Sequence, residues 1–138
     1  MNAVFTILVA DRNRNIREFL QRELTAQGHR VLSVCDARQI LKIIEIESPD
    51  LLILDLDIPY VDEVRVLDKL QNGTLAIPLV VHTLLTDYAT HPAIKKADGF
   101  VEKDGNNVNN LKQIVAGVLQ KHYPQRFLQA SQARTNKD

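Results

Sequence analysis

Short apolar runs alternate with segments of helical periodicity along most of this chain, and that alternation restricts the fold more than any other feature. The apolar runs have the length of buried strands. Each is followed by residues whose apolar positions recur at the spacing of one helix face. Parallel strands are buried on both sides and are joined by helical crossovers, so such a pattern favours an α/β fold with a doubly wound parallel sheet.

Five strand–helix units can be placed on this pattern. The expected strands cover residues 4–10, 30–35, 51–54, 78–81 and 99–102. Asn13 is expected to cap the first helix, which Gly28 ends, and Asp36 with Gln39 resembles a capping box for the second. A short fourth helix is expected to begin at Pro92, which leaves residues 84–91 as a loop.

The length and charge of the chain indicate one domain and exclude some classes of partner. At 138 residues, a single core spans residues 1–123, and the polar residues 124–138 are expected to form a frayed tail or the start of a linker. Lys+Arg and Asp+Glu both number 17, so net charge gives no reason to bind nucleic acid or an anionic membrane.

Few features of the sequence bear on where in the cell the protein is located. The lone Cys35 excludes an internal disulfide and is expected to be buried on its strand. No stretch is long and apolar enough for a membrane span, and no signal peptide is recognisable. We therefore expect a cytoplasmic protein.

Polar side chains follow four of the expected strands at the point where each strand ends. Asp55 comes directly after the apolar run Leu51–Leu54, and Asp11, Thr83 and Lys103 stand at three other strand ends. Open α/β sheets bind ligands outside the carboxyl ends of their strands. Two acids, a hydroxyl and an ammonium group brought together there would suit the handling of a phosphoryl group.

The motifs around these residues resemble the receiver domain of two-component response regulators, over about residues 4–121. They are Ile-Leu-Val-x-Asp at 7–11, Asp-Leu-x-x-Pro at 55–59, Pro-Leu-Val-Val-x-Thr at 78–83 and Gly-Phe-Val-x-Lys at 99–103. Each is weak alone, but their order and spacing together are specific. The resemblance implies a flavodoxin-like (βα)5 sheet with strand order 2-1-3-4-5.

The resemblance also implies a role for each of these residues. Asp55 would be the phosphoacceptor, and Lys103 would neutralise a phosphoryl oxygen. Thr83 would turn its hydroxyl toward the phosphoryl group, and Phe100 would be the aromatic switch coupled to it. A divalent metal, usually Mg²⁺, would be held by Asp11, Asp55 and the backbone carbonyl of Asp57.

The resemblance to a receiver domain implies that the protein acts through partner proteins and does not turn over a substrate of its own. The phosphoryl donor would be a histidine kinase or a phosphotransfer protein, and a separate output protein would receive the signal. We expect no direct binding to nucleic acid or membrane. Some receivers pair through the region of the fourth helix, so a homodimer is a further possibility. The protein is not expected to be an enzyme.

Two positions depart from the usual receiver pattern. Arg12 stands where a second acid normally follows Asp11, and a guanidinium repels Mg²⁺, which counts against metal binding. Arg12 is instead expected to pair with Asp55 or Asp57, or to contact the phosphoryl group. Leu84 stands where a small residue usually follows Thr83, and it is expected to obstruct the phosphoryl group.

Other functions stay open on the sequence. A pseudo-receiver would dock on a partner without phosphoryl chemistry, and Arg12 and Leu84 favour it. Asp55 and Asp57 also match the Asp-x-Asp motif of haloacid-dehalogenase-type phosphatases, although those enzymes carry it on their first strand. A nucleotide-binding module is weakly supported because no Gly-rich loop follows the first strand. His82 is expected to be a buried, hydrogen-bonded histidine and not a metal ligand.

Overall fold

A five-stranded parallel sheet forms the centre of the computed structural model, which describes residues 4–71, 76–84, 91–103 and 108–135, with side chains as far as residue 129. The strand order is β2-β1-β3-β4-β5, and all neighbouring pairs are parallel. The flavodoxin-like order 2-1-3-4-5 is therefore confirmed. The strands are β1 (Thr6–Ala10), β2 (Arg30–Val34), β3 (Leu51–Leu54), β4 (Leu79–Thr83) and β5 (Gly99–Glu102).

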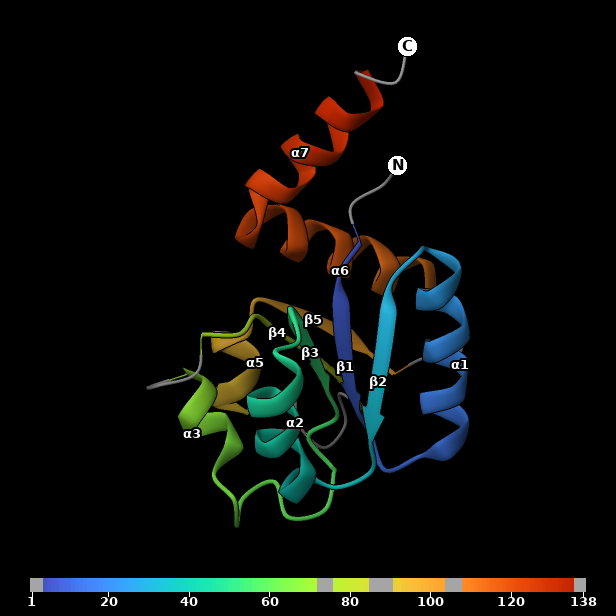
Figure 1. Ribbon diagram of the computed structural model, residues 1–138. Coiled ribbons are helices and arrows are strands. Elements are labelled where there is room, and N and C mark those ends of the chain that lie inside the picture. The colour runs from blue at the N-terminus through green and yellow to red at the C-terminus, as the bar shows by residue number, and fades with distance from the viewer. Residues whose placement is uncertain (1–3, 72–75, 85–90, 104–107, 136–138) are drawn as a thin grey trace.

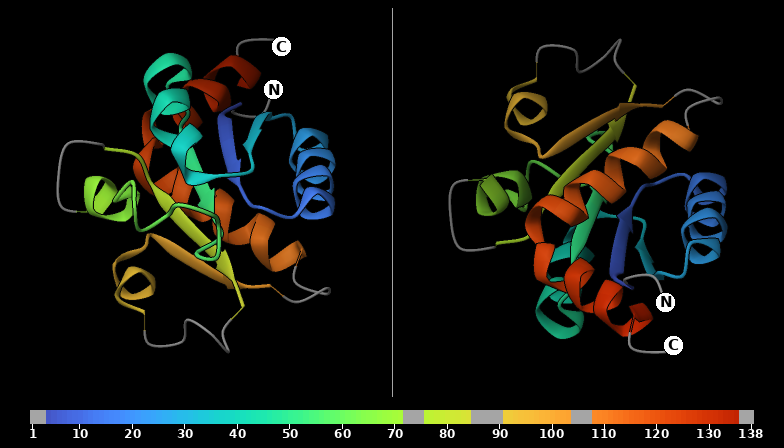
Figure 2. Two further views of the ribbon diagram at one scale, coloured as in Figure 1. Left: turned by 90° about the horizontal axis from the view of Figure 1, so that it is seen from below. Right: turned by 90° about the horizontal axis from the view of Figure 1, so that it is seen from above.

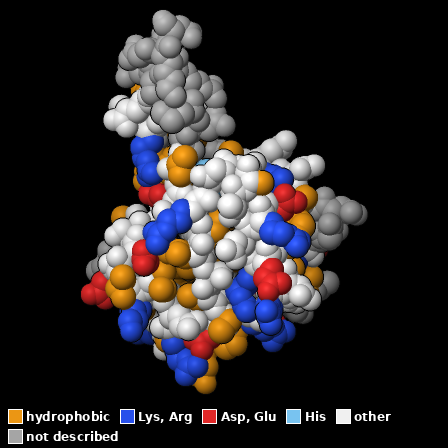
Figure 3. Space-filling view, turned by 45° about the vertical axis from the view of Figure 1, so that its right-hand side comes forward, with side chains coloured by type: hydrophobic (Ala, Val, Ile, Leu, Met, Phe, Trp, Pro, Cys, Tyr) orange, Lys and Arg blue, Asp and Glu red, His pale blue; other side chains and the backbone are white. Residues whose placement is uncertain are grey.

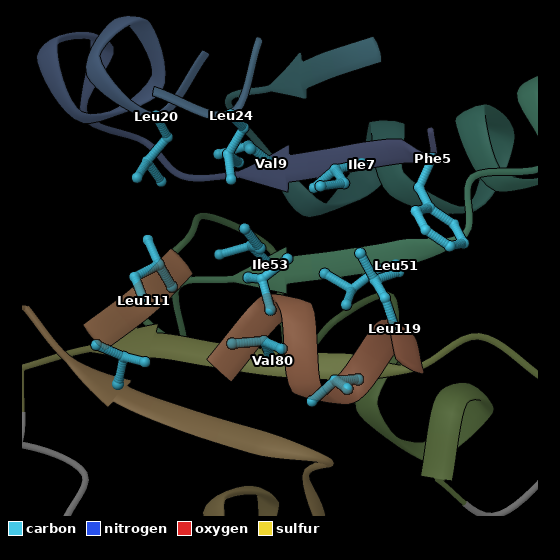
Figure 4. Close-up of a cluster of buried hydrophobic side chains, with 13 residues drawn as sticks. Phe5, Ile7, Val9, Leu20, Leu24, Leu51, Ile53, Val80, Leu111 and Leu119 are labelled. Carbon is cyan, nitrogen blue, oxygen red and sulfur yellow. The ribbon is translucent and has the colours of Figure 1, made fainter. Parts of the chain in front are cut away.

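Helices cover both faces of this sheet (Figures 1 and 2). Helices α1 (Arg14–Ala26) and α6 (Val108–His122) bury their apolar residues against one face, in the cluster drawn in Figure 4. The other face is covered by α2 (Ile40–Glu47), which the 3-10 turn η1 (Ala37–Gln39) precedes, by α3 (Val66–Gln71) and by α5 (Pro92–Lys96). Because β1, β3 and β4 lie between these two cores, their side chains are buried on both sides, as the apolar runs predict.

Local sequence signals account for several helix ends. The Asn13 side chain accepts hydrogen bonds from the backbone N–H groups of Asn15 and Ile16, which confirms it as the cap of α1. Gly28, just beyond that helix, has φ +94°, a left-handed conformation that glycine adopts without strain. Asp36 caps η1, and Pro92 occupies the first turn of α5 as expected.

Three expectations need correction or restriction. Cys35 is exposed rather than buried, because β2 is an edge strand that ends at Val34. Residues 124–135 form a helix, α7 (Pro124–Thr135), rather than a frayed tail. The loop expected at 84–91 lies largely outside the described residues. Among the described helices, none combines the length and apolar character that a membrane span requires.

Helix α7 is held to the amino-terminal end of the sheet, far from the carboxyl ends of the strands (Figure 1). The guanidinium of Arg126 donates to Asp50 Oδ1 at 2.7 Å and to the Val4 carbonyl at 2.8 Å, and it stacks 4.2 Å from the Phe5 ring centre. Phe127 packs 5.5 Å from the same ring, centre to centre. Arg126, a charged residue in the first turn of α7, thus has defined partners, so the polar composition of this segment does not indicate a tail.

The close contact between β5 and α6 yields a stability prediction. A Cβ placed on Gly99 would lie 2.6 Å from Ile114 Cγ2, a distance that real structures do not tolerate. We expect Gly99→Ala to lower the free energy of unfolding by about 1–3 kcal/mol, as overpacking a filled site does. Urea denaturation would measure it. Gly117→Ala is the matched control, since a Cβ there meets nothing within 4 Å. Equal stability of the two variants would contradict the prediction.

Candidate functional site

The carboxyl ends of four strands bring the polar residues of the four motifs into one buried cluster. Asp11 follows β1, Asp55 follows β3, Thr83 ends β4 and Lys103 follows β5. The Lys103 ammonium lies 2.7 Å from Asp11 Oδ2 and 2.9 Å from Asp55 Oδ2. Only 2% of Asp11 and 3% of Asp55 is exposed, so both carboxyl groups depend on partners within the protein.

Lys103 is the electrostatic centre of this cluster. Burial opposes its charged form, but hydrogen bonds from its ammonium to Asp11 and then to Asp55 outweigh that effect and raise the pKa of Lys103. The amine therefore stays protonated at neutral pH. Burial raises the pKa of Asp11, and the hydrogen bond from Lys103 offsets that rise only in part.

Both oxygens of the Asp55 carboxylate have donors. Oδ1 accepts the Thr83 hydroxyl at 3.0 Å and the backbone N–H of Asp57 at 3.0 Å, while Oδ2 accepts from Lys103. The N–H of Asp57 can reach Asp55 because the chain turns immediately after β3, where the Ile58 N–H donates to the Asp55 carbonyl at 3.2 Å. These contacts hold the carboxylate in one orientation at the edge of the sheet, with its charge partly balanced.

Arg12 pairs with Asp57, one of the partners that the sequence left open. Its guanidinium lies 2.6 Å from Asp57 Oδ2, and the side chains are 61% and 47% exposed. Figure 3 shows basic side chains, several of them beside acidic ones, along the lower edge of the molecule. That edge corresponds to the carboxyl ends of the strands in Figure 1. The positive charge of Arg12 thus lies beside the turn that follows β3, at the rim of the cluster.

Sequence reasoning missed two groups that hold Asp11 in place. The guanidinium of Arg17 donates to the Asp11 backbone carbonyl at 2.7 Å, and the backbone N–H of Asn13 donates to Asp11 Oδ1 at 2.8 Å. The Asn13 contact could have been anticipated, because a carboxylate two residues before an N–H commonly accepts from it. Nothing in the sequence singles out Arg17 from the other basic residues of α1.

The remaining candidates lie around this cluster. Leu84 is 49% exposed, so its side chain is not packed into the buried part of the site. Phe100 lies on β5, half-buried against the core beside Val81. His82 is buried as expected, but within the described part of the chain its Nδ1 has no hydrogen-bond partner, which corrects the expectation of a hydrogen-bonded ring.

The donor set does not suit a resident Mg²⁺ ion. Mg²⁺ takes near-octahedral oxygen ligands, chiefly carboxylates and water. Among the described residues, no group of three or more His, Cys, Asp or Glu side chains is placed to hold a metal. Asp11 and Asp55 share the Lys103 ammonium, and the carboxylate of Asp57 is occupied by Arg12.

Comparison with known proteins places this architecture in a family. The family model of the response regulator receiver domain matches residues 7–116 of this chain. The probable transcriptional regulator ycf27 of Cyanidium caldarium is 36% identical over 81 residues, which are 59% of this chain and 32% of that protein. The regulatory protein PhoP of Bacillus subtilis is 35% identical over 77 residues, which are 56% of this chain and 32% of PhoP. The chain therefore spans about a third of the length of these curated relatives.

Solved structures agree. The response regulator TrrA of Thermotoga maritima, crystallised with Mg²⁺ and BeF, is 27% identical with a TM-score of 0.72, over 86% of this chain and 99% of TrrA. A structure of TrrA bound to the histidine kinase ThkA matches with the same TM-score of 0.72 and 28% identity, over the same shares of 86% and 99%. Strand order, motif positions and family match agree, and the chain belongs to the response regulator receiver domain family.

Proposed function

We propose that this receiver domain accepts a phosphoryl group on Asp55 from a histidine kinase or a phosphotransfer protein and passes the signal to a partner protein. The observation that carries the proposal is the contact of Lys103 with both Asp11 and Asp55, at 2.7 and 2.9 Å, in a buried cluster at the carboxyl edge of the sheet. A carboxylate attacks an anionic phosphoryl group only where nearby positive charge reduces the repulsion, and this cluster supplies it.

The chemical step is an exchange of one bond to phosphorus for another. A carboxylate oxygen of Asp55 forms the new O–P bond while the N–P bond of the donor phosphohistidine breaks. The electron pair of that bond returns to the imidazole nitrogen, and the product is an aspartyl phosphate. Lys103 stays between Asp11 and the phosphoryl oxygens. The backbone N–H of Asp57 keeps the acceptor carboxyl oriented.

The product would change the hydrogen bonds at the ends of β4 and β5. The Thr83 hydroxyl donates to Asp55 Oδ1, the oxygen that a phosphoryl group would crowd, so it would turn toward the new phosphoryl oxygens. The aspartyl phosphate carries a charge of about −2 in place of the −1 of the carboxylate, and such a change is enough to bias a two-state segment. Phe100 is half-buried on the neighbouring strand and would move with Thr83.

Partners of relatives support the proposed role in signalling. TrrA binds the histidine kinase ThkA in one of the structures compared above. PhoP and ycf27 are named as transcriptional regulators and are about three times as long as the segment that matches. We propose that this domain acts on an output partner by protein contact rather than by touching nucleic acid.

Incubation with acetyl phosphate, followed by intact-mass spectrometry, tests the acceptor. We expect a gain of about 80 Da, the mass of one added phosphoryl group, which Asp55→Asn abolishes. Asp57→Asn is the matched control, because Asp57 contributes its backbone N–H to the acceptor and that group survives the substitution. An adduct that persists in Asp55→Asn would contradict the assignment.

Absence of any adduct in the native protein would favour the pseudo-receiver, whose specific support is the ion pair between Arg12 and Asp57. In that case the domain would still bind its partner, and the affinity would be the same for the native protein and for Asp55→Asn.

A further inference from the structure

The guanidinium of Arg12 is a feature of the site that neither metal chemistry nor packing explains. It follows Asp11 directly in the chain and lies 2.6 Å from the Asp57 carboxylate, and the backbone N–H of Asp57 donates to the acceptor Asp55. Arg12 is thus held by a residue that itself contacts the acceptor. Its side chain is 61% exposed, so it can turn without disturbing the core.

Among the described residues, the protein itself already supplies cations to the carboxylates of the site. Three carboxylates, on Asp11, Asp55 and Asp57, face two cations, Lys103 and Arg12. A divalent ion would have to displace the ammonium or lie beside a guanidinium that repels it. The ion pair of Arg12 with Asp57 is largely exposed, and exposed pairs are weak, so a more highly charged anion can take the place of the carboxylate.

We propose that Arg12 replaces the metal ion in this site, and this inference rests on the proposed function. When a phosphoryl group arrives on Asp55, the guanidinium leaves Asp57 and binds the phosphoryl oxygens opposite Lys103. The planar guanidinium offers two parallel N–H donors that match a phosphoryl group, and a phosphoryl dianion attracts it more strongly than a carboxylate does. The domain therefore accepts a phosphoryl group without a divalent cation.

Phosphorylation of the full chain with and without metal tests the proposal. The protein is freed of divalent ions, mixed with acetyl phosphate in metal-free buffer or with excess MgCl2, and followed by intact-mass spectrometry. We expect the native protein to form its adduct at rates that agree within about twofold in the two buffers. Arg12→Ala should slow the metal-free reaction at least about tenfold, as loss of an arginine at a phosphoryl group does.

Matched variants separate this effect from a general loss of surface charge or of folding. Arg14 lies two residues away, is 80% exposed and pairs with Glu18 at 2.9 Å, so Arg14→Ala should react like the native protein. Arg12→Lys keeps the charge and should retain part of the metal-free rate. Thermal melting checks that each variant is folded.

Calorimetric titration with MgCl2 gives a readout that does not depend on phosphorylation. The native protein should show no saturable binding, whereas Arg12→Asp should show saturable binding of Mg²⁺, because it adds a carboxylate ligand. Saturable Mg²⁺ binding by the native protein, or the same absence of binding in Arg12→Asp, would overturn the inference.

The outcomes of the phosphorylation assay are distinguishable. An adduct that forms only with MgCl2, or one that forms equally fast in Arg12→Ala without metal, overturns the role of Arg12 and leaves Asp55 as acceptor. An adduct in neither buffer overturns the proposed function, and the role of Arg12 with it.

Discussion

Replacement of Lys103 by methionine is expected to lower the free energy of unfolding by about 3–5 kcal/mol, the usual result of removing one partner from a buried charge cluster. The ammonium is the cation that lies between Asp11 and Asp55, which are 2% and 3% exposed. Without it, two neighbouring carboxylates repel each other out of reach of water. Asp11, whose pKa burial already raises, would then take up a proton, which limits the loss.

Chemical denaturation of three variants at neutral pH would measure this effect. Lys112→Met is the matched control: Lys112 pairs with Glu23 at 3.0 Å near the surface, and such pairs contribute about 0–1 kcal/mol. The double variant Asp11→Asn/Lys103→Met removes one of the two facing charges and should recover a large part of the loss. Native-like stability of Lys103→Met would show that the cluster does not depend on the lysine.

Acid is expected to destabilise the protein through His82. Burial, followed by the positive charge of Lys103, lowers the pKa of His82 from 6.5 to about 4. Below pH 6.5 the unfolded chain binds a proton on this histidine while the folded protein does not, so stability falls until the pH reaches about 4. At 1.36 kcal/mol per pH unit, the contribution lost over that range is about 3 kcal/mol.

The variant His82→Leu isolates this contribution from those of the other titrating groups. We expect the difference in unfolding free energy between the native protein and His82→Leu to shift by about 3 kcal/mol in favour of the variant between pH 7 and pH 4. Asp11 acts with the opposite sign, because a raised pKa in the folded state makes acid stabilising, but it is present in both proteins and cancels. A difference that stays constant with pH would contradict the prediction.

The fold could be predicted because it depends on patterns that each segment carries by itself. The run Leu51–Leu54 is buried on both faces, Asn13 caps the helix that follows it and Gly99 begins the fifth strand, as their local signals indicate. The placing of Asp11, Asp55, Thr83 and Lys103 followed from the same patterns, since carboxyl ends of parallel strands meet at one edge.

What the sequence could not predict depends on contacts between distant segments. The choice of Asp57 as the partner of Arg12 depends on the turn after β3, and the hydrogen bond from Arg17 to Asp11 depends on the position of α1. Cys35 was misplaced because the exposure of an edge strand is set by strand order. The helix at residues 124–135 could not be predicted from their polar composition, because Arg126 binds Asp50 and the Val4 carbonyl, which are distant in the sequence.

The position of α7 bears on where this domain can be cut. Phe5 is 1% exposed, and Tyr123, Arg126 and Phe127 lie against its ring. A fragment that stops at residue 123 would lack Arg126 and Phe127, which would expose part of the Phe5 ring just before β1. It would also leave the Asp50 carboxylate without its arginine partner, just before β3. These are the two strands that Asp11 and Asp55 follow. An expression fragment intended for phosphorylation assays should therefore keep at least the first turn of α7.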